Sequence, residues 1–103
     1  MVRLMTIILK VNPEASEIFY AVQILTSPSL LSKTNSRFKG VSVWEDKVPG
    51  MNKYCTGKLK NFKEAVTLQS EMKNIGFTDA FVVVYRNGQR ITLQEAKRIP
   101  GVK

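Results

Sequence analysis

The chain carries its clearest structural signal at Ala80-Phe81-Val82-Val83-Val84-Tyr85, which is followed by Asn87-Gly88 and then by Gln89-Arg90-Ile91. Valine and aromatic side chains favour strands, and Asn-Gly is the preferred two-residue turn of a β-hairpin. We therefore predict a strand over 80–85 and a final hairpin that closes on 89–91.

One helix is predicted before this strand and a second, shorter one after it. Upstream, Asn61 and Glu64 have the spacing of a capping box, and Gly76 suits the left-handed position after a helix end. Between them apolar residues recur at helical spacing: Phe62, Ala65, Val66, Leu68, Met72 and Ile75. Downstream, Thr92 and Glu95 repeat the capping-box spacing, which predicts a short helix over 93–99 that Pro100-Gly101 ends.

Three further strands are predicted nearer the N-terminus, over 18–25, 41–48 and 51–58. The last two flank Pro49-Gly50, a turn dipeptide, so they should form a hairpin. Residues 26–40 are polar and weakly periodic, and we expect a loop there with at most two helical turns. This order indicates an α+β domain in which helices cover one face of an antiparallel sheet and leave the other face open.

Composition limits the chemistry that the chain can perform. The 103 residues suffice for one domain and include no histidine and one cysteine, Cys55. A Cys/His nucleophile, a zinc ligand set and a glycine-rich phosphate loop are therefore missing. The one close acid pair, Glu45-Asp46, points to opposite faces if it lies in a strand, which argues against a two-carboxylate glycosidase. We expect a protein that is not an enzyme and needs no metal or cofactor.

The charge and the N-terminus bear on partners and location. Sixteen Lys and Arg against eight Asp and Glu give a net charge of +8, which favours an anionic partner. The apolar run from Met1 is cut at Lys10, well short of the roughly 20 residues of a membrane span, and it lacks a signal-peptide cleavage pattern. Export would then depend on residues outside this chain.

Several segments in order resemble the SPOR (sporulation-related repeat) family. They are Tyr20-Ala21-Val22-Gln23-Ile24, Asn52-Lys53-Tyr54-Cys55-Thr56-Gly57, Glu64-Ala65, Gly76-Phe77 and Asp79-Ala80-Phe81-Val82-Val83. Phe38-Lys39-Gly40 is similar to a feature of SPOR-like domains from Bacteroidetes-type bacteria, some of which follow an N-acetylmuramoyl-L-alanine amidase domain. The chain departs from the family at Leu25, where many relatives have Gly, and in its poorly formed first helix.

The resemblance implies an RNP-like (ferredoxin-like) fold, with two helices behind a four-stranded antiparallel sheet. It also implies a non-catalytic module that binds peptidoglycan glycan strands, preferentially those stripped of stem peptides, across the open sheet face. Such a module would target a cell-wall or cell-division protein and would work in the periplasm or cell envelope as part of a longer exported protein. We expect an N-terminal extension over 1–17, the SPOR-like domain over 18–99 and a tail over 100–103.

Strand alternation and the resemblance together select the glycan-binding residues. Alternation separates Gln23 from Tyr20 and Val22, and a glutamine amide is costly to bury, so we expect Gln23 on the open face and Tyr20, Val22, Val66 and Met72 in the core. The same parity exposes Lys53 and Cys55 and places Trp44 on the open sheet. The predicted glycan-binding residues are Gln23, Thr26, Ser27, Trp44, Lys53 and Cys55.

These residues also have ordinary structural interpretations. Gln23 and Lys53 could be merely solvated, Thr26 and Ser27 could serve a turn, and a lone Trp44 could belong to the core. Two other functions stay open for the sheet: RNA binding, as in other RNP-like folds, and docking of a partner protein. RNA is the less favoured partner, because 76–85 matches the RNP1 pattern with the wrong spacing and no basic residue precedes Gly76.

Overall fold

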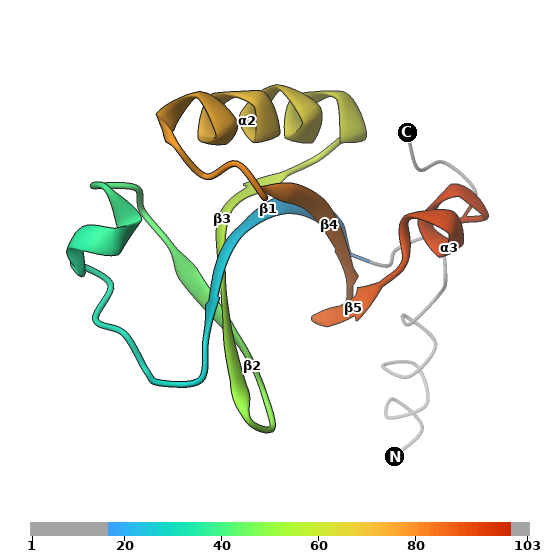
Figure 1. Ribbon diagram of the computed structural model, residues 1–103. Helices are drawn as coiled ribbons and strands as arrows, with labels where there is room; N and C mark the ends of the chain where they lie inside the picture. The colour runs from blue at the N-terminus through green and yellow to red at the C-terminus, as the bar shows by residue number, and fades with distance from the viewer. Residues whose placement is uncertain (1–16, 100–103) are drawn as a thin grey trace, which may run out of the picture.

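The computed structural model describes residues 17–99, so the predicted tail and all but the last residue of the predicted extension lie outside it. These residues form one sheet with helices on its outer side (Figure 1). In chain order the elements are β1 (Ile18–Ser27), the 3₁₀ turn η2 (Ser36–Phe38), β2 (Trp44–Val48), β3 (Met51–Leu59), α2 (Phe62–Ile75), β4 (Phe81–Arg86), β5 (Gln89–Ile91) and α3 (Leu93–Lys97).

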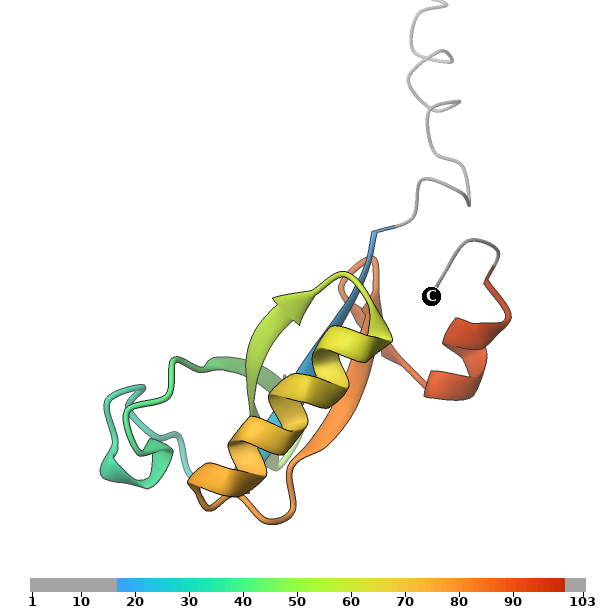
Figure 2. The same cartoon turned by 90° about the horizontal axis from the view of Figure 1, so that it is seen from above.

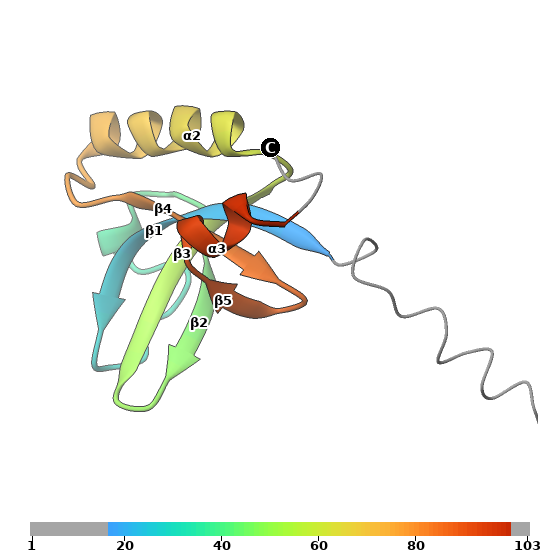
Figure 3. The ribbon, with the colours of Figure 1, turned by 90° about the vertical axis from the view of Figure 1, so that its right-hand side faces the viewer.

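The strands run in the order β2-β3-β1-β4-β5, and every neighbouring pair is antiparallel. β1 lies in the middle, and α2 carries the chain over it from β3 to β4. The sheet curls into a half-barrel whose outer, convex side faces α2 (Figures 1 and 3). The α+β class and the antiparallel sheet are confirmed, whereas the four-stranded RNP-like sheet is wrong: β5 adds a fifth strand and the sheet is curled.

Irregular pairing of β1 with β3 accounts for much of this curl. Their register shifts between Tyr20 and Val22 and again between Gln23 and Leu25. Gly57 lies within the first irregularity with a left-handed φ of +85°. Bulges of this kind increase the local twist and bend of a strand, so the sheet closes toward a barrel instead of staying open.

The segment between β1 and β2 forms a single 3₁₀ turn. The Asn35 side chain accepts a hydrogen bond from the Arg37 backbone N–H and starts this turn, while Lys39 adopts a left-handed backbone and ends it. The expected loop with at most two helical turns is thus a loop with one 3₁₀ turn. The Tyr54 hydroxyl accepts a hydrogen bond of 2.7 Å from the Leu31 N–H and ties this loop to β3.

The predicted capping residues are used at both helices, although for α2 only the Asn61 half of the expected capping box is seen. The Asn61 side chain accepts from the Glu64 N–H, Gly76 ends α2 with a positive φ, and Thr92 and Glu95 form a complete capping box at α3. α2 has the predicted bounds. α3 is shorter than predicted, since it ends at Lys97.

The core lies between the convex side of the sheet and the helices. α2 covers the middle of the sheet, and α3 packs beside β4 (Figure 2). Tyr20, Val22 and Met72 are buried there, as predicted. Val66 was placed in the core wrongly, because Ala65, Leu68 and Met72 form the inward stripe and Val66 lies on its flank. Within 17–99 no helix is both long and apolar enough to cross a membrane.

Candidate functional site on the concave face

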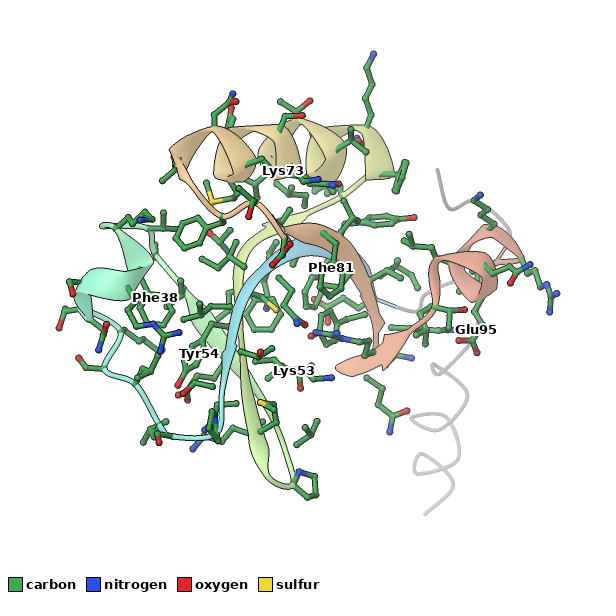
Figure 4. All side chains as sticks on the ribbon, viewed as in Figure 1. Phe38, Lys53, Tyr54, Lys73, Phe81 and Glu95 are labelled. Atoms are coloured by element: carbon green, nitrogen blue, oxygen red, sulfur yellow. The ribbon has the colours of Figure 1, made fainter. Side chains whose placement is uncertain are left out.

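Side-chain alternation gathers one set of residues on the inner side of the half-barrel, here called the concave face. Cross-strand neighbours share a face, and the pairs Trp44–Cys55, Asp46–Lys53, Gln23–Cys55, Gln23–Phe81 and Tyr85–Arg90 connect the set across all five strands. Figure 4 shows Lys53 and Phe81 on this side. The concave face comprises Phe19, Ala21, Gln23, Trp44, Asp46, Lys53, Cys55, Phe81, Val83, Tyr85 and Arg90.

Three aromatic rings form a cluster near the start of β1. Phe19 stacks on Tyr85 with ring centroids 5.1 Å apart, and Trp44 meets both rings edge-on at 5.8 and 5.4 Å. The Trp44 indole N–H donates to the Gly57 carbonyl at 3.0 Å, which fixes the ring. Lys58 places its ammonium 4.8 Å from the Phe19 ring centroid. The cluster is therefore rigid, and a cation lies beside it.

Next to the rings lies a polar network to which each strand contributes one residue. Arg90 of β5 donates to the Gln23 amide oxygen at 2.7 Å and to the Tyr85 hydroxyl at 2.8 Å. The same guanidinium lies 3.3 Å from the Asp46 carboxylate, to which Tyr85 donates at 2.5 Å. The Cys55 thiol lies 3.8 Å from Arg90 and 3.9 Å from the Tyr85 hydroxyl. We call Gln23, Asp46, Cys55, Tyr85 and Arg90 the five-strand network.

The five-strand network keeps the Tyr85 hydroxyl and the Cys55 thiol in their neutral forms. Burial, and next the hydrogen bond to Asp46, raise the pKa of Tyr85 well above its ordinary value. Burial raises the pKa of Cys55 to about 11, against smaller lowering effects of Tyr85 and Arg90. A neutral, enclosed thiol is a poor nucleophile, and Asp46 already interacts with Arg90 and Tyr85. Both the Cys55 thiol and the Tyr85 hydroxyl therefore keep their protons at neutral pH.

Some of the predicted glycan-binding residues are accessible in the structure, and others are buried. Thr26 is exposed, and Lys53 and Trp44 are partly exposed on the concave face. Gln23 and Cys55 lie on the expected face but are buried, so the prediction that they are accessible is wrong: the curl brings Arg90 and Tyr85 over them.

Ser27 is also buried, in the turn after β1. Its hydroxyl accepts from the Ser29 N–H at 3.1 Å, and its carbonyl accepts from the Asn52 side chain. The turn interpretation of Ser27 therefore describes its place better than a glycan contact does.

Sequence reasoning missed Tyr85, Arg90, Asp46 and the exposed ring of Phe81. A signal for two of them was present, because the two-residue turn Asn87-Gly88 fixes the pairing of Tyr85 with Arg90 across the hairpin. Phe81 is 45% exposed, and beside it a depression of about 230 Å³ is lined by Gln23, Ile24, Leu25, Thr26, Asp79 and Phe81. This depression continues the concave face toward the end of β1.

Among residues 17–99, no group of three or more His, Cys, Asp or Glu side chains lies close enough together to hold a metal ion. No protein-family model, curated protein or solved structure matches the chain.

Proposed function

We propose that the chain is a non-catalytic module that binds peptidoglycan glycan strands along its concave face. The observation that carries this proposal is the combination of aromatic surface and cations on one curved sheet. Phe81 exposes its ring, Trp44 is partly exposed, and Lys53 and Lys58 supply positive charge, whereas Arg90 is already paired with Asp46. Sugar rings have apolar C–H faces that pack on aromatic rings, and an elongated curved surface suits a linear polymer.

The cations give a reason why stripped glycan would be preferred. Removal of a stem peptide leaves a free lactyl carboxylate on N-acetylmuramic acid, so each stripped disaccharide gains a negative charge. Opposite charges about 4 Å apart gain roughly 1 kcal/mol even in water, and more beside a low-dielectric surface. Lys53 would meet such a carboxylate, because its cross-strand neighbour Asp46 already interacts with Arg90 and Tyr85.

A pull-down with purified sacculi tests the proposal directly. Binding should rise after amidase treatment and fall as salt increases from 50 to 500 mM. Lys53→Glu should weaken binding more than Lys33→Glu, which makes the same charge change in the loop between β1 and β2.

Three results would count against the proposal. Release of muropeptides, or shortening of purified glycan strands, would show that the protein is an enzyme. Equal binding to intact and stripped sacculi would show that the lactyl carboxylate does not contribute to binding. Tighter binding of single-stranded RNA, lost in Lys53→Glu, would favour the RNA alternative.

The proposal includes a location. A glycan-binding module has to reach the periplasm or cell envelope, where it would direct a longer cell-wall or cell-division protein to sites of peptide removal. Fractionation of cells that carry the full-length protein checks this location.

A further inference from the structure

α2 presents two apolar side chains to solvent on one flank. Phe62 and Val66 are each 40% exposed and stand one turn apart, so they are neighbours on the helix surface. The inward stripe of Ala65, Leu68 and Met72 lies on a different side. The Phe62 ring meets the buried Tyr20 ring edge-on at 5.9 Å, which holds it in place. We call Phe62 and Val66 the apolar flank.

Lysines surround this apolar flank. Lys60 and Lys63 are both exposed and bracket Phe62 in the sequence, and Lys63 is three residues before Val66, hence beside it on the helix. Figure 4 shows Lys73 on α2, and two helical turns separate it from Val66 on the same side. The two ion pairs within 17–99, Lys47–Glu45 and Arg90–Asp46, involve none of these lysines.

Both signs of charge occur around the first turn of α2, but lysines are in excess. Lys60 and Lys63 lie on either side of Phe62 in the sequence, and Glu64 follows them. The nearest acids on α2 are Glu64 and Glu71, each exposed. The first turn of α2 therefore combines exposed apolar area with two lysines, Lys60 and Lys63, against one acid, Glu64.

We infer that this flank of α2 docks on the surface of a bilayer that contains anionic lipids. Partly exposed aromatic and aliphatic side chains enter the boundary between head groups and acyl chains, and lysines beside them are attracted by anionic head groups. A nucleic acid would use Phe62 and the lysines but would gain little from Val66, since an aliphatic side chain cannot stack on bases as an aromatic ring does. Because α2 lies on the convex side, the concave face stays free while the flank is bound (Figure 3).

Co-sedimentation of the full chain with vesicles tests this inference. Vesicles that contain phosphatidylglycerol should bind the protein, and vesicles of phosphatidylcholine alone should bind it at least fivefold less at low salt. Val66→Asp and the double change Lys60→Glu/Lys63→Glu should each reduce binding to the anionic vesicles at least fivefold. Circular dichroism would verify that each variant folds.

Two matched controls test whether the effect is specific to the apolar flank. One adds an acid elsewhere on α2, and the other removes the same amount of positive charge elsewhere. Ile75→Asp introduces the same charge at the other end of α2, about 14 Å from Val66 along the helix axis, where the native side chain is 45% exposed. Lys33→Glu/Lys47→Glu changes the net charge equally, away from the first turn of α2. Both controls should bind anionic vesicles as the native chain does.

Equal loss of binding in the controls, or no preference for anionic vesicles, would overturn the inference. So would binding of single-stranded RNA that the Lys60→Glu/Lys63→Glu variant loses while vesicle binding is absent. Sacculus binding should be unchanged in Val66→Asp, so this inference and the glycan proposal can fail separately.

Discussion

At the scale of single residues, the sheet face of Gln23 was predicted correctly, but its accessibility was not. Alternation predicts that Gln23 lies opposite Tyr20 and Val22, and it does. A glutamine on an open face should tolerate replacement at an unchanged melting temperature. In the structure Gln23 is 6% exposed and accepts a hydrogen bond from Arg90.

Gln23→Ala should therefore lower the free energy of unfolding by about 1–2 kcal/mol, because Arg90 loses a buried acceptor. Urea denaturation measures this change. Thr26→Ala, at an exposed position of the same strand, should cost less than about 0.5 kcal/mol. If the two variants were equally stable, the bond between Gln23 and Arg90 would not contribute to folding.

Cys55 makes stability depend on pH in the alkaline range. Burial raises the pKa of its thiol from an ordinary value of 9.0 to about 11. The unfolded chain thus loses the thiol proton first, so the stabilisation is complete below pH 9 and is lost as the pH rises to about 11. The loss amounts to roughly 2–3 kcal/mol.

Unfolding of the native chain and of Cys55→Ala, compared from pH 7 to pH 11, isolates this contribution. Lysines and tyrosines titrate in both proteins, so only the difference between the two curves reports Cys55. That difference should shrink as the pH passes 9. Parallel curves would mean that the thiol is not held neutral by the fold.

At the scale of elements, the sequence indicated most helix and strand positions because their signals are local. The Asn61 cap, the Asn87-Gly88 turn and the Thr92–Glu95 box each act within a few residues. The irregular register of β1 with β3 is different, because it depends on contacts between segments about thirty to forty residues apart. The curl, and with it the burial of Gln23 and Cys55, was therefore out of reach of pattern reasoning.

Gly57 is the residue at which this irregularity can be tested. Its φ is +85°, and an added Cβ would come within 2.7 Å of the Leu68 Cδ2 atom on α2. Gly57→Ala should cost about 2–3 kcal/mol, from backbone strain together with displacement of Leu68. Chemical denaturation gives the value.

Gly50 is the matched control, since it has a φ of +79° in the β2–β3 turn and nothing within 4 Å of its added Cβ. Gly50→Ala should cost about 1 kcal/mol, the backbone part alone. An equal cost for both variants would show that Leu68 moves freely and that the packing of α2 on β3 is loose there.

At the scale of the whole molecule, the ion pair between Asp46 and Arg90 joins β2 to β5, which are the two edge strands of the sheet. Their ion pair and the Tyr85 hydroxyl span the inside of the half-barrel. A double-mutant cycle with Asp46→Ala and Arg90→Ala should give a coupling energy of about 1–2 kcal/mol, since the pair is partly shielded from water.

The pair Lys47–Glu45 serves as the comparison for that cycle. Its atoms are 4.0 Å apart and the Lys47 side chain is 60% exposed, so its coupling should be near zero. A coupling for Asp46–Arg90 as small as this would indicate that the backbone alone maintains the curvature.

The central position of β1 also has a mechanical consequence. β1 pairs with β3 on one side and with β4 on the other over most of its length. Tension applied to the chain ahead of Glu17, while the concave face is held on a wall polymer, would pull this strand lengthwise between two ladders. Such shear loads many hydrogen bonds at once, whereas peeling an edge strand breaks them one by one. The domain should thus resist force best along the direction in which a tethered module would be pulled.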